Sequence, residues 1–203
     1  MRVLRVGTDS LLVEVADTAA AMRVYDEARR REVKAAEVVP AARTVLFAGV
    51  ADLSRLEVDL ASWESEKATS RPSGSGLVVE VPTVYDGPDM ESVARHWDVS
   101  TRELVDLHTS TEMVVAFCGF APGFAYCTGL EAMRPVPRLD EPRTKVPAGS
   151  VGLADVFTGV YPSASPGGWQ LIGRTDLVLW DEDREQPATL APGSRVRFVE
   201  VSG

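Results

Sequence analysis

The residues best suited to chemistry in this chain lie in the segment PRTKVPAGSVG, residues 142–152. Two prolines fix the backbone on either side of Arg143 and Lys145, because the proline ring locks φ. A guanidinium held in place can bind a carboxylate through two parallel hydrogen bonds. Gly149 and Ser150 then offer backbone N–H groups and a hydroxyl that could hold an oxyanion or an amide carbonyl. This pattern predicts contact with a small anionic amide.

A structural interpretation of the same segment stays open. The basic residues could form a solvated loop with ion pairs to Asp140 and Glu141, and Ser150 could simply complete a turn. No GxSxG nucleophile elbow occurs in the chain, so the pattern does not indicate a serine hydrolase of that type. His108 could serve Ser150 as a base only if the fold brings the two together.

A second motif, SPGGWQLIGRT at residues 165–175, joins a turn to a large aromatic residue and an arginine. Trp169 could stack on a ligand or pack in the core. Arg174 could bind substrate or pair with an acid such as Asp89. Tyr161, four residues before the motif, could add a hydroxyl.

The segment FCGFAPGFAY, residues 117–126, places glycines beside aromatic residues. Glycine allows close approach of the backbone, so Phe120 and its aromatic neighbours could form the apolar wall of a small-ligand pocket. The alternative is aromatic packing over the mouth of a barrel.

These motifs resemble a known family. GFxPGFxY, PRxxxPRxxVPAGSVG and YPxxSPGGWxxIGRT, in this order between Gly119 and Thr175, are similar to allophanate hydrolase subunit 1, a family that also includes the B subunit of 5-oxoprolinase and the Kip-type inhibitor of a sensor kinase. Weaker agreement includes YDGPD at residues 85–89, LHT at residues 107–109, and APGSRVRF at residues 191–198. Because His108 lies in LHT, the resemblance raises it above an ordinary structural histidine.

The resemblance implies a subunit of an ATP-dependent 5-oxoprolinase, which opens the lactam of 5-oxoproline to glutamate. It implies a companion that is similar to allophanate hydrolase subunit 2 or to the C subunit of 5-oxoprolinase. The alternatives are an inhibitor of a sensor histidine kinase and an amide- or urea-binding subunit of an allophanate hydrolase or urea carboxylase complex. The chain has no GxxxxGK[ST] motif, so ATP is expected only at the level of the complex.

The predicted site collects these candidates on one concave surface. The expected catalytic residues are His108, Ser150 and Lys145. The expected substrate-binding residues are Arg143, Gly149, Trp169, Arg174, Phe120 and Tyr161, and no metal is expected. For docking the companion, the expected exposed aromatic residues are Phe120, Phe124, Tyr126 and Trp169.

The elements that must position these residues fall into two expected domains, 1–76 and 77–203. In the first, strands at 2–6, 10–15 and 44–49 and helices at about 17–36 and 52–67 predict a small α+β domain, followed by a linker-like stretch at 69–76. Strand 77–82 and two short helices, 90–97 and 100–108, come next, the helices forming an insertion at about 89–108. Asp89 is the expected cap of the first and Ser100–Glu103 a capping box for the second.

Further strands are expected at 113–119, 150–153, 170–172, 177–180 and 195–201. Short strands joined by Gly and Pro turns predict a closed or nearly closed barrel, and the resemblance implies that it is cyclophilin-like. Between Met113 and Trp180 lie nine of the sixteen glycines and seven of the thirteen prolines, which indicates loops of fixed shape rather than a flexible linker.

Composition limits the function classes. The chain has 203 residues, 45% of them hydrophobic, and a net charge of −9. Residues 1–75 carry twelve acids and eleven bases, about −1, so residues 76–203 carry −8. This acidic half argues against a nucleic-acid partner. Two cysteines and two histidines fit no zinc motif, and no apolar run is long enough for a signal peptide or a membrane span. A cytoplasmic protein is expected.

Overall fold

The computed structural model describes residues 1–63, 78–130 and 133–203. The chain forms two compact units, Met1–Gly74 and Ser75–Gly203. The boundary expected at residue 76 and the linker-like stretch 69–76 lie outside the described residues, so the division proposed from the sequence stays a prediction.

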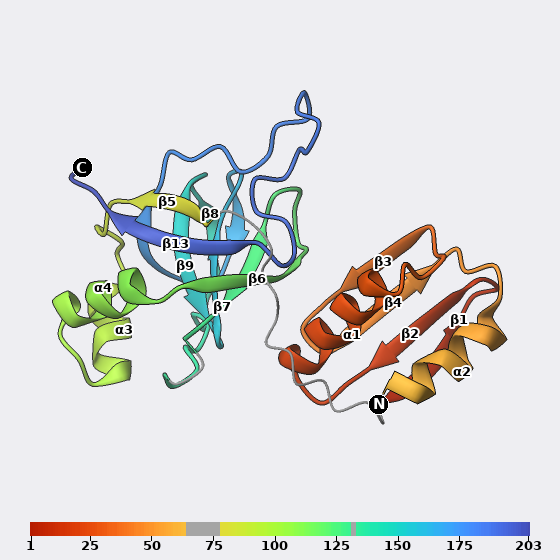
Figure 1. Ribbon diagram of the computed structural model, residues 1–203. Helices are drawn as coiled ribbons and strands as arrows, with labels where there is room; N and C mark the ends of the chain where they lie inside the picture. The colour runs from red at the N-terminus through yellow and green to blue at the C-terminus, as the bar shows by residue number, and fades with distance from the viewer. Residues whose placement is uncertain (64–77, 131–132) are drawn as a thin grey trace. The chain divides into compact units, whose positions relative to one another are not determined.

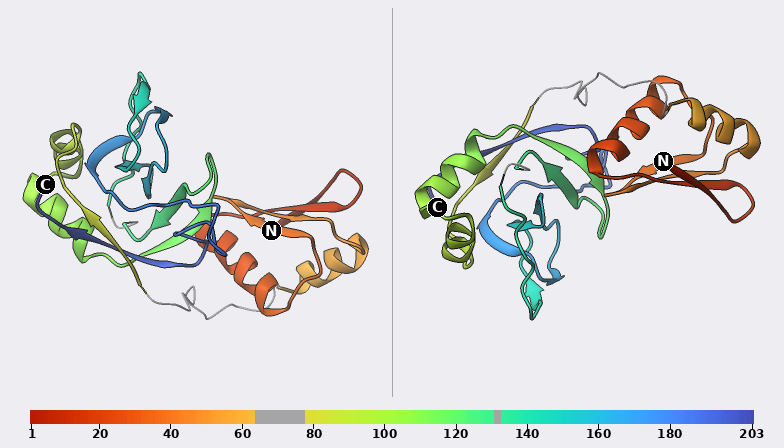
Figure 2. Two further views of the ribbon diagram at one scale, coloured as in Figure 1. Left: turned by 90° about the horizontal axis from the view of Figure 1, so that it is seen from above. Right: turned by 90° about the horizontal axis from the view of Figure 1, so that it is seen from below.

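The first unit contains a four-stranded antiparallel sheet in the order β1-β2-β4-β3. Two helices cover the same face of this sheet (Figure 2). The helices and the inward strand residues, among them Leu11 and Phe47, form one hydrophobic core. The elements are β1 (Arg2–Val6), β2 (Ser10–Glu14), α1 (Thr18–Arg30), β3 (Glu37–Pro40), β4 (Thr44–Ala48) and α2 (Leu53–Trp63).

The predicted strands at 2–6, 10–15 and 44–49 are found to within a residue, but helix α1 is shorter than predicted. Asp17 caps it by accepting a hydrogen bond from the Ala20 amide. It ends at Arg30 rather than near residue 36, because Glu32 takes a positive φ of 50°. The chain then enters β3, which the sequence analysis missed and which pairs with β4.

The second unit is a seven-stranded mixed sheet in the order β12-β9-β10-β7-β6-β13-β5, curved into a nearly closed barrel (Figure 1). Its two end strands meet at one antiparallel bridge between Val84 and Arg174. The strands are β5 (Val79–Thr83), β6 (Met113–Cys118), β7 (Ala125–Thr128), β9 (Ser150–Ala154), β10 (Phe157–Val160), β12 (Gln170–Arg174) and β13 (Arg195–Glu200).

A two-stranded ribbon and two helices complete this unit. The ribbon pairs β8 (Arg143–Val146) with β11 (Ser165–Gly167). Helices α3 (Met90–Trp97) and α4 (Thr101–Ser110) follow β5 and lie at one end of the barrel (Figure 1). The capping box predicted at Ser100 and Glu103 is present, with both reciprocal hydrogen bonds formed.

Several predictions for the barrel strands were incomplete. Residues 177–180 do not form a strand; only Trp180 makes a bridge, to Ala188. Four short strands, β7, β8, β10 and β11, were missed. Each has only three or four residues, and such a length is too short to show a period in the sequence.

Glycines in the barrel make room for one large side chain. A Cβ on Gly159 would lie 2.9 Å from the Trp169 ring, and one on Gly152 would lie 3.2 Å from the Trp169 Cβ. The indole therefore packs directly against backbone. This explains why β9 and β10 need glycine at those positions, and it places Trp169 inside the fold.

Candidate functional site

The segment YDGPD, residues 85–89, runs along β12 and connects the sequence motifs to one another. The amides of Gly87 and Asp89 donate to the carbonyls of Ile172 and Leu171. A Cβ on Gly87 would lie 2.4 Å from the Leu171 carbonyl oxygen, so glycine is required for this close approach. The YDGPD segment therefore contacts the SPGGWQLIGRT motif directly.

Asp89 is the polar centre of this contact. It is only 8% exposed. One carboxylate oxygen accepts from the Arg143 guanidinium at 2.8 Å, and the other accepts from the Leu171 amide at 2.6 Å. Asp89 occupies the N-cap position of α3, but its side chain makes no capping hydrogen bond; the expectation of an ordinary cap was therefore wrong, because both oxygens bind elsewhere.

The two arginines of the motifs pair with acids other than those expected. Arg143 binds Asp89 and also donates to the Trp169 carbonyl at 3.4 Å. Arg174 pairs through Nε with Asp86 at 3.0 Å rather than with Asp89. Arg143 thus uses two of its N–H donors within the fold and its side chain is 28% exposed, whereas the Arg174 side chain is 52% exposed.

The Gly149 and Ser150 amides, expected to be free, are both hydrogen-bonded. The Gly149 amide donates to the Tyr161 carbonyl at 2.7 Å, and the Ser150 amide donates to the Pro147 carbonyl at 3.3 Å. The expectation that these amides hold an oxyanion is therefore wrong. Gly149 has φ +80°, and a Cβ there would lie 2.1 Å from the Thr175 carbonyl oxygen. The small residues serve close packing.

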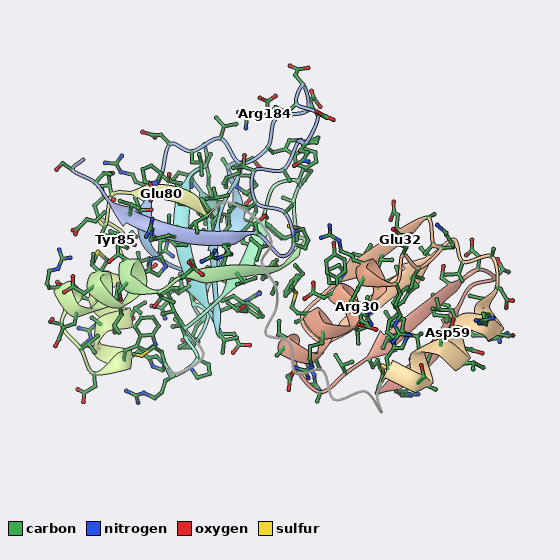
Figure 3. The ribbon with its side chains drawn as sticks, viewed as in Figure 1. Arg30, Glu32, Asp59, Glu80, Tyr85 and Arg184 are labelled. Atoms are coloured by element: carbon green, nitrogen blue, oxygen red, sulfur yellow. The ribbon has the colours of Figure 1, made fainter. Side chains whose placement is uncertain are left out.

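His108 lies in the barrel core with no exposed surface. Its Nδ1 is 2.6 Å from the Tyr85 hydroxyl and its Nε2 is 3.2 Å from the Thr158 hydroxyl. Both ring nitrogens are therefore engaged, and neither partner is Ser150. Burial lowers the pKa of His108 to about 3, and burial, followed by the charge of Glu200, raises the pKa of Tyr85. Tyr85 is labelled in Figure 3, just beyond β5.

Three of the four aromatic residues expected at the surface are packed together instead. Phe124 and Trp169 are buried, as is the predicted site residue Tyr161, and Tyr126 is half-buried against Phe124 and Trp169. The Phe124 ring centroid lies 5.3 Å from that of Trp169 and 5.2 Å from that of Tyr161, both nearly edge-on. Such contacts stabilise a core. Trp169 therefore cannot stack on a ligand from solution, and Phe124 and Trp169 are not docking surface.

Phe120 is the exception, because its side chain is 64% exposed. It has φ +72°, and the Ala121 amide donates across it to the Gly119 carbonyl at 2.9 Å. This is a γ-turn with a positive φ, a conformation that is rare and strained for a bulky residue. The neighbouring loop packs on Trp180, since a Cβ on Gly123 would lie 2.9 Å from the Trp180 Cβ.

A cleft of about 300 Å³ lies where the two end strands of the barrel separate. Its lining residues are Pro82, Val84, Arg174, Thr175, Asp176, Leu177 and Val201. Arg174 is the one predicted site residue in this lining. Buried His108, Ser150 and Trp169 lie elsewhere, and Lys145 is exposed on β8. The predicted residues therefore do not share one concave surface. One residue of the sequence could have indicated the cleft: Pro82, a proline at the end of the predicted strand 77–82.

Other chemistry is limited in the described part of the chain. Burial raises the pKa of Cys118 to about 11 and that of Cys127 to about 12, so neither thiol is a thiolate nucleophile at neutral pH. In residues 1–63, 78–130 and 133–203, no three His, Cys, Asp or Glu side chains gather as a metal site. Across the same ranges, no helix combines the length and apolar character needed to cross a bilayer.

The Asp89–Arg143 pair predicts a structural role that can be measured. Arg143→Ala leaves a nearly buried carboxylate without its counter-charge and should lower the free energy of unfolding by about 2–3 kcal/mol. Arg197→Gln, which removes an exposed arginine paired with Glu80, should cost less than about 1 kcal/mol. Urea denaturation measures both values. If Arg143→Ala lowered the free energy of unfolding by no more than Arg197→Gln does, the contact with Asp89 would not be stabilising.

His108 predicts an acid-sensitive stability. Because its folded pKa lies below the 6.5 of a free imidazole, the unfolded chain binds a proton that the folded chain does not. This stability is complete above pH 6.5 and is lost at about 1.4 kcal/mol per pH unit as the pH falls toward 3. Urea denaturation from pH 7.5 to 4.5 should show a shallower fall in the free energy of unfolding for His108→Gln than for the wild type. A wild-type slope in His108→Gln would contradict the assignment.

Comparison with known proteins gives a coherent family. Residues 1–190 match the family described as carboxyltransferase domain, subdomain C and D. The chain is 49% identical over 140 residues to the B subunit of 5-oxoprolinase from Escherichia coli O157:H7, covering 68% of this chain and 63% of that protein. It is 46% identical over 128 residues to the B subunit of 5-oxoprolinase from Bacillus subtilis (strain 168), covering 62% and 53%.

A solved structure agrees with the fold. The crystal structure of TTHA0988 superposes with a TM-score of 0.72 at 32% identity, covering 97% of this chain and 40% of that one. The chain spans between about half and two thirds of the length of the two curated relatives. With the match over residues 1–190 and these relatives, the chain belongs to the carboxyltransferase domain family, subdomain C and D, together with proteins named as the B subunit of 5-oxoprolinase.

Proposed function

We propose that this chain acts as a subunit of an ATP-dependent 5-oxoprolinase. The observation that carries the proposal is the 49% identity over 140 residues to a protein named as the B subunit of that enzyme. In the reaction, one water adds its oxygen to the lactam carbonyl carbon of 5-oxoproline and the C–N bond breaks, giving glutamate. A second water converts ATP to ADP and phosphate. We place the complex in the cytoplasm and the ATP site on a companion protein.

Within this proposal, contact with substrate falls first to the exposed charged residues among those predicted, Arg174 and Lys145, and exposed Phe120 is assigned to docking of the companion instead. Gly149, Trp169 and Tyr161 are assigned to packing within the barrel. Arg143 is assigned to stabilising the barrel through its ion pair with Asp89. His108 and Ser150, predicted as catalytic, are buried, so we assign acid–base chemistry to groups that a companion would bring. The N-terminal unit is proposed as an α+β domain spanning residues 1–76, and residues 77–203 as a cyclophilin-like barrel.

The activity test is direct. The chain mixed with its companion subunits, 5-oxoproline and ATP should produce equal amounts of glutamate and ADP, and omission of this chain or of ATP should abolish glutamate formation. Amino-acid analysis and a coupled ADP assay measure the two products. A folded, reconstituted complex that forms no glutamate would remove the proposal and leave inhibition of a sensor histidine kinase as the function to test by kinase autophosphorylation.

A carboxylase-type role is the second candidate, because the family is described as a carboxyltransferase domain. The two roles differ in their need for bicarbonate, which carboxylation consumes and lactam hydrolysis does not. Glutamate formation by the reconstituted complex should continue in bicarbonate-free buffer.

We also propose that the companion docks on an apolar patch made of Phe120, Val178 and Trp180, which are all exposed. The Phe120 ring is exposed but packs edge-on against Phe124 and Tyr161, and fixed exposed aromatic residues are typical anchors of interfaces. The following loop carries four acids among residues 181–185 and projects from the barrel, with Arg184 near its tip (Figure 3). A partner with an apolar pocket rimmed by basic residues would fit this patch.

Substitution at the patch tests the interface. Phe120→Ser should weaken association with the companion at least about tenfold, the effect of an interface anchor worth more than about 1.4 kcal/mol. Val58→Ser removes a side chain of similar exposure, 69%, from the first unit and should leave association unchanged. Co-expression followed by size-exclusion chromatography and titration measures both. Wild-type affinity in Phe120→Ser would place the interface elsewhere.

A further inference from the structure

The cleft between the end strands of the barrel has a specific cause. The Thr83 carbonyl accepts from the Val201 amide, next to β13, so the alternate residues Val84 and Pro82 direct their backbone groups toward β12. Val84 makes both hydrogen bonds of its bridge with Arg174. Continuing this antiparallel register by two residues would pair Pro82 with Asp176. Proline has no N–H to donate.

The strands therefore separate after one bridge, and the gap becomes the cleft. The Thr175 amide faces the other neighbour, as alternation along the strand requires, and donates to the Gly149 carbonyl. Both members of the missing pair, Pro82 and Asp176, line the cleft. An opening produced by the backbone in this way is a fixed part of the barrel.

The lining combines apolar walls with two opposite charges. Val84, Leu177 and Val201 supply the walls, and Arg174 and Asp176 supply the charges. Asp86 holds Arg174 through Nε, which orients the guanidinium and leaves its terminal nitrogens as donors for a second carboxylate. Asp176 is an acceptor for an N–H group. The Thr175 hydroxyl already accepts from the Leu177 amide at 3.2 Å.

The size of the cleft restricts the ligand further. Ligand pockets in proteins typically measure about 300–1,000 Å³, so a volume of about 300 Å³ suits a small metabolite better than a nucleotide. A ligand that satisfies the lining has a carboxylate for Arg174, an N–H group for Asp176, and a compact apolar face for Val84, Leu177 and Val201.

We propose that this cleft binds a small cyclic carboxylic acid that carries a ring N–H, with Arg174 binding the carboxylate and Asp176 accepting from the N–H. The naming of 5-oxoproline as that acid rests on the proposed function. The cleft and its two charged residues do not rest on it.

Three probes separate the parts of this recognition. The full chain is titrated by calorimetry and by ligand-observed NMR with 5-oxoproline, with 2-pyrrolidone, which lacks the carboxylate, and with cyclopentanecarboxylate, which lacks the N–H. The acid with both groups should bind best, and 2-pyrrolidone should bind at least about tenfold more weakly. Failure to detect 5-oxoproline at millimolar concentrations, or equal binding of 2-pyrrolidone, would overturn the proposal.

Two variants assign the roles. Arg174→Gln should weaken binding of both acids at least about tenfold. Asp176→Asn should weaken 5-oxoproline but not cyclopentanecarboxylate, because the latter has no N–H to lose and gains from removal of a nearby negative charge. Arg197→Gln is the matched control, since Arg197 pairs with Glu80 and has the same 52% side-chain exposure as Arg174. Circular dichroism and thermal unfolding verify that each variant is folded, and Arg174→Lys provides a second, conservative variant.

The outcomes distinguish this inference from the proposed function. A reconstituted complex that hydrolyses 5-oxoproline with an unchanged KM in Arg174→Gln would overturn the cleft and keep the function. A chain that binds cyclic acids through Arg174 and Asp176, in a complex that forms no glutamate, would keep the cleft and overturn the function.

Discussion

The barrel depends on one carboxylate that serves two elements distant in the sequence. Asp89 accepts the Arg143 guanidinium from β8 and the Leu171 amide from β12, at the point where α3 begins. Removing a charge from water is costly unless it is paired and hydrogen-bonded. Both oxygens of Asp89 are satisfied, and this is possible only when the helix start, the ribbon and the strand are in one arrangement. The carboxylate therefore selects that arrangement as well as stabilising it.

The dense motifs of the chain are explained largely by close packing. Gly87 lies against the backbone of β12, Gly149 against Thr175, and Gly159 against the Trp169 ring. Each of these positions would be blocked by a single added methyl group. Glycine-rich motifs can suggest binding loops in a sequence. In this protein they are explained mainly by a small barrel with short strands, in which backbone and side chains pack closely at the glycines.

Sequence reasoning identified local features well and long-range contacts poorly. The capping box at Ser100, the limits of α3 and the existence of a barrel follow from periodicity, turn residues and the family resemblance. The acids that pair with Arg143 and Arg174 do not, because Asp89 and Asp86 lie 54 and 88 residues away and nothing local marks the choice between them. The burial of His108 could not be predicted either, because the sequence LHT does not distinguish a core histidine from a site histidine. The cleft depended on the register between Pro82 and Asp176, which only the fold supplies.

The parallel pairing of β5 with β13 also has a consequence for the order of folding. The ion pair between Glu80 and Arg197 on these strands spans 117 residues, and contacts of such separation form slowly because a long loop must close first. During synthesis, β5 leaves the ribosome long before its neighbour β13 exists. The first unit, with local strand pairs, can fold at once, whereas the barrel must wait with an unpaired edge. Chaperones that shield exposed strands would act on this unit rather than on the first.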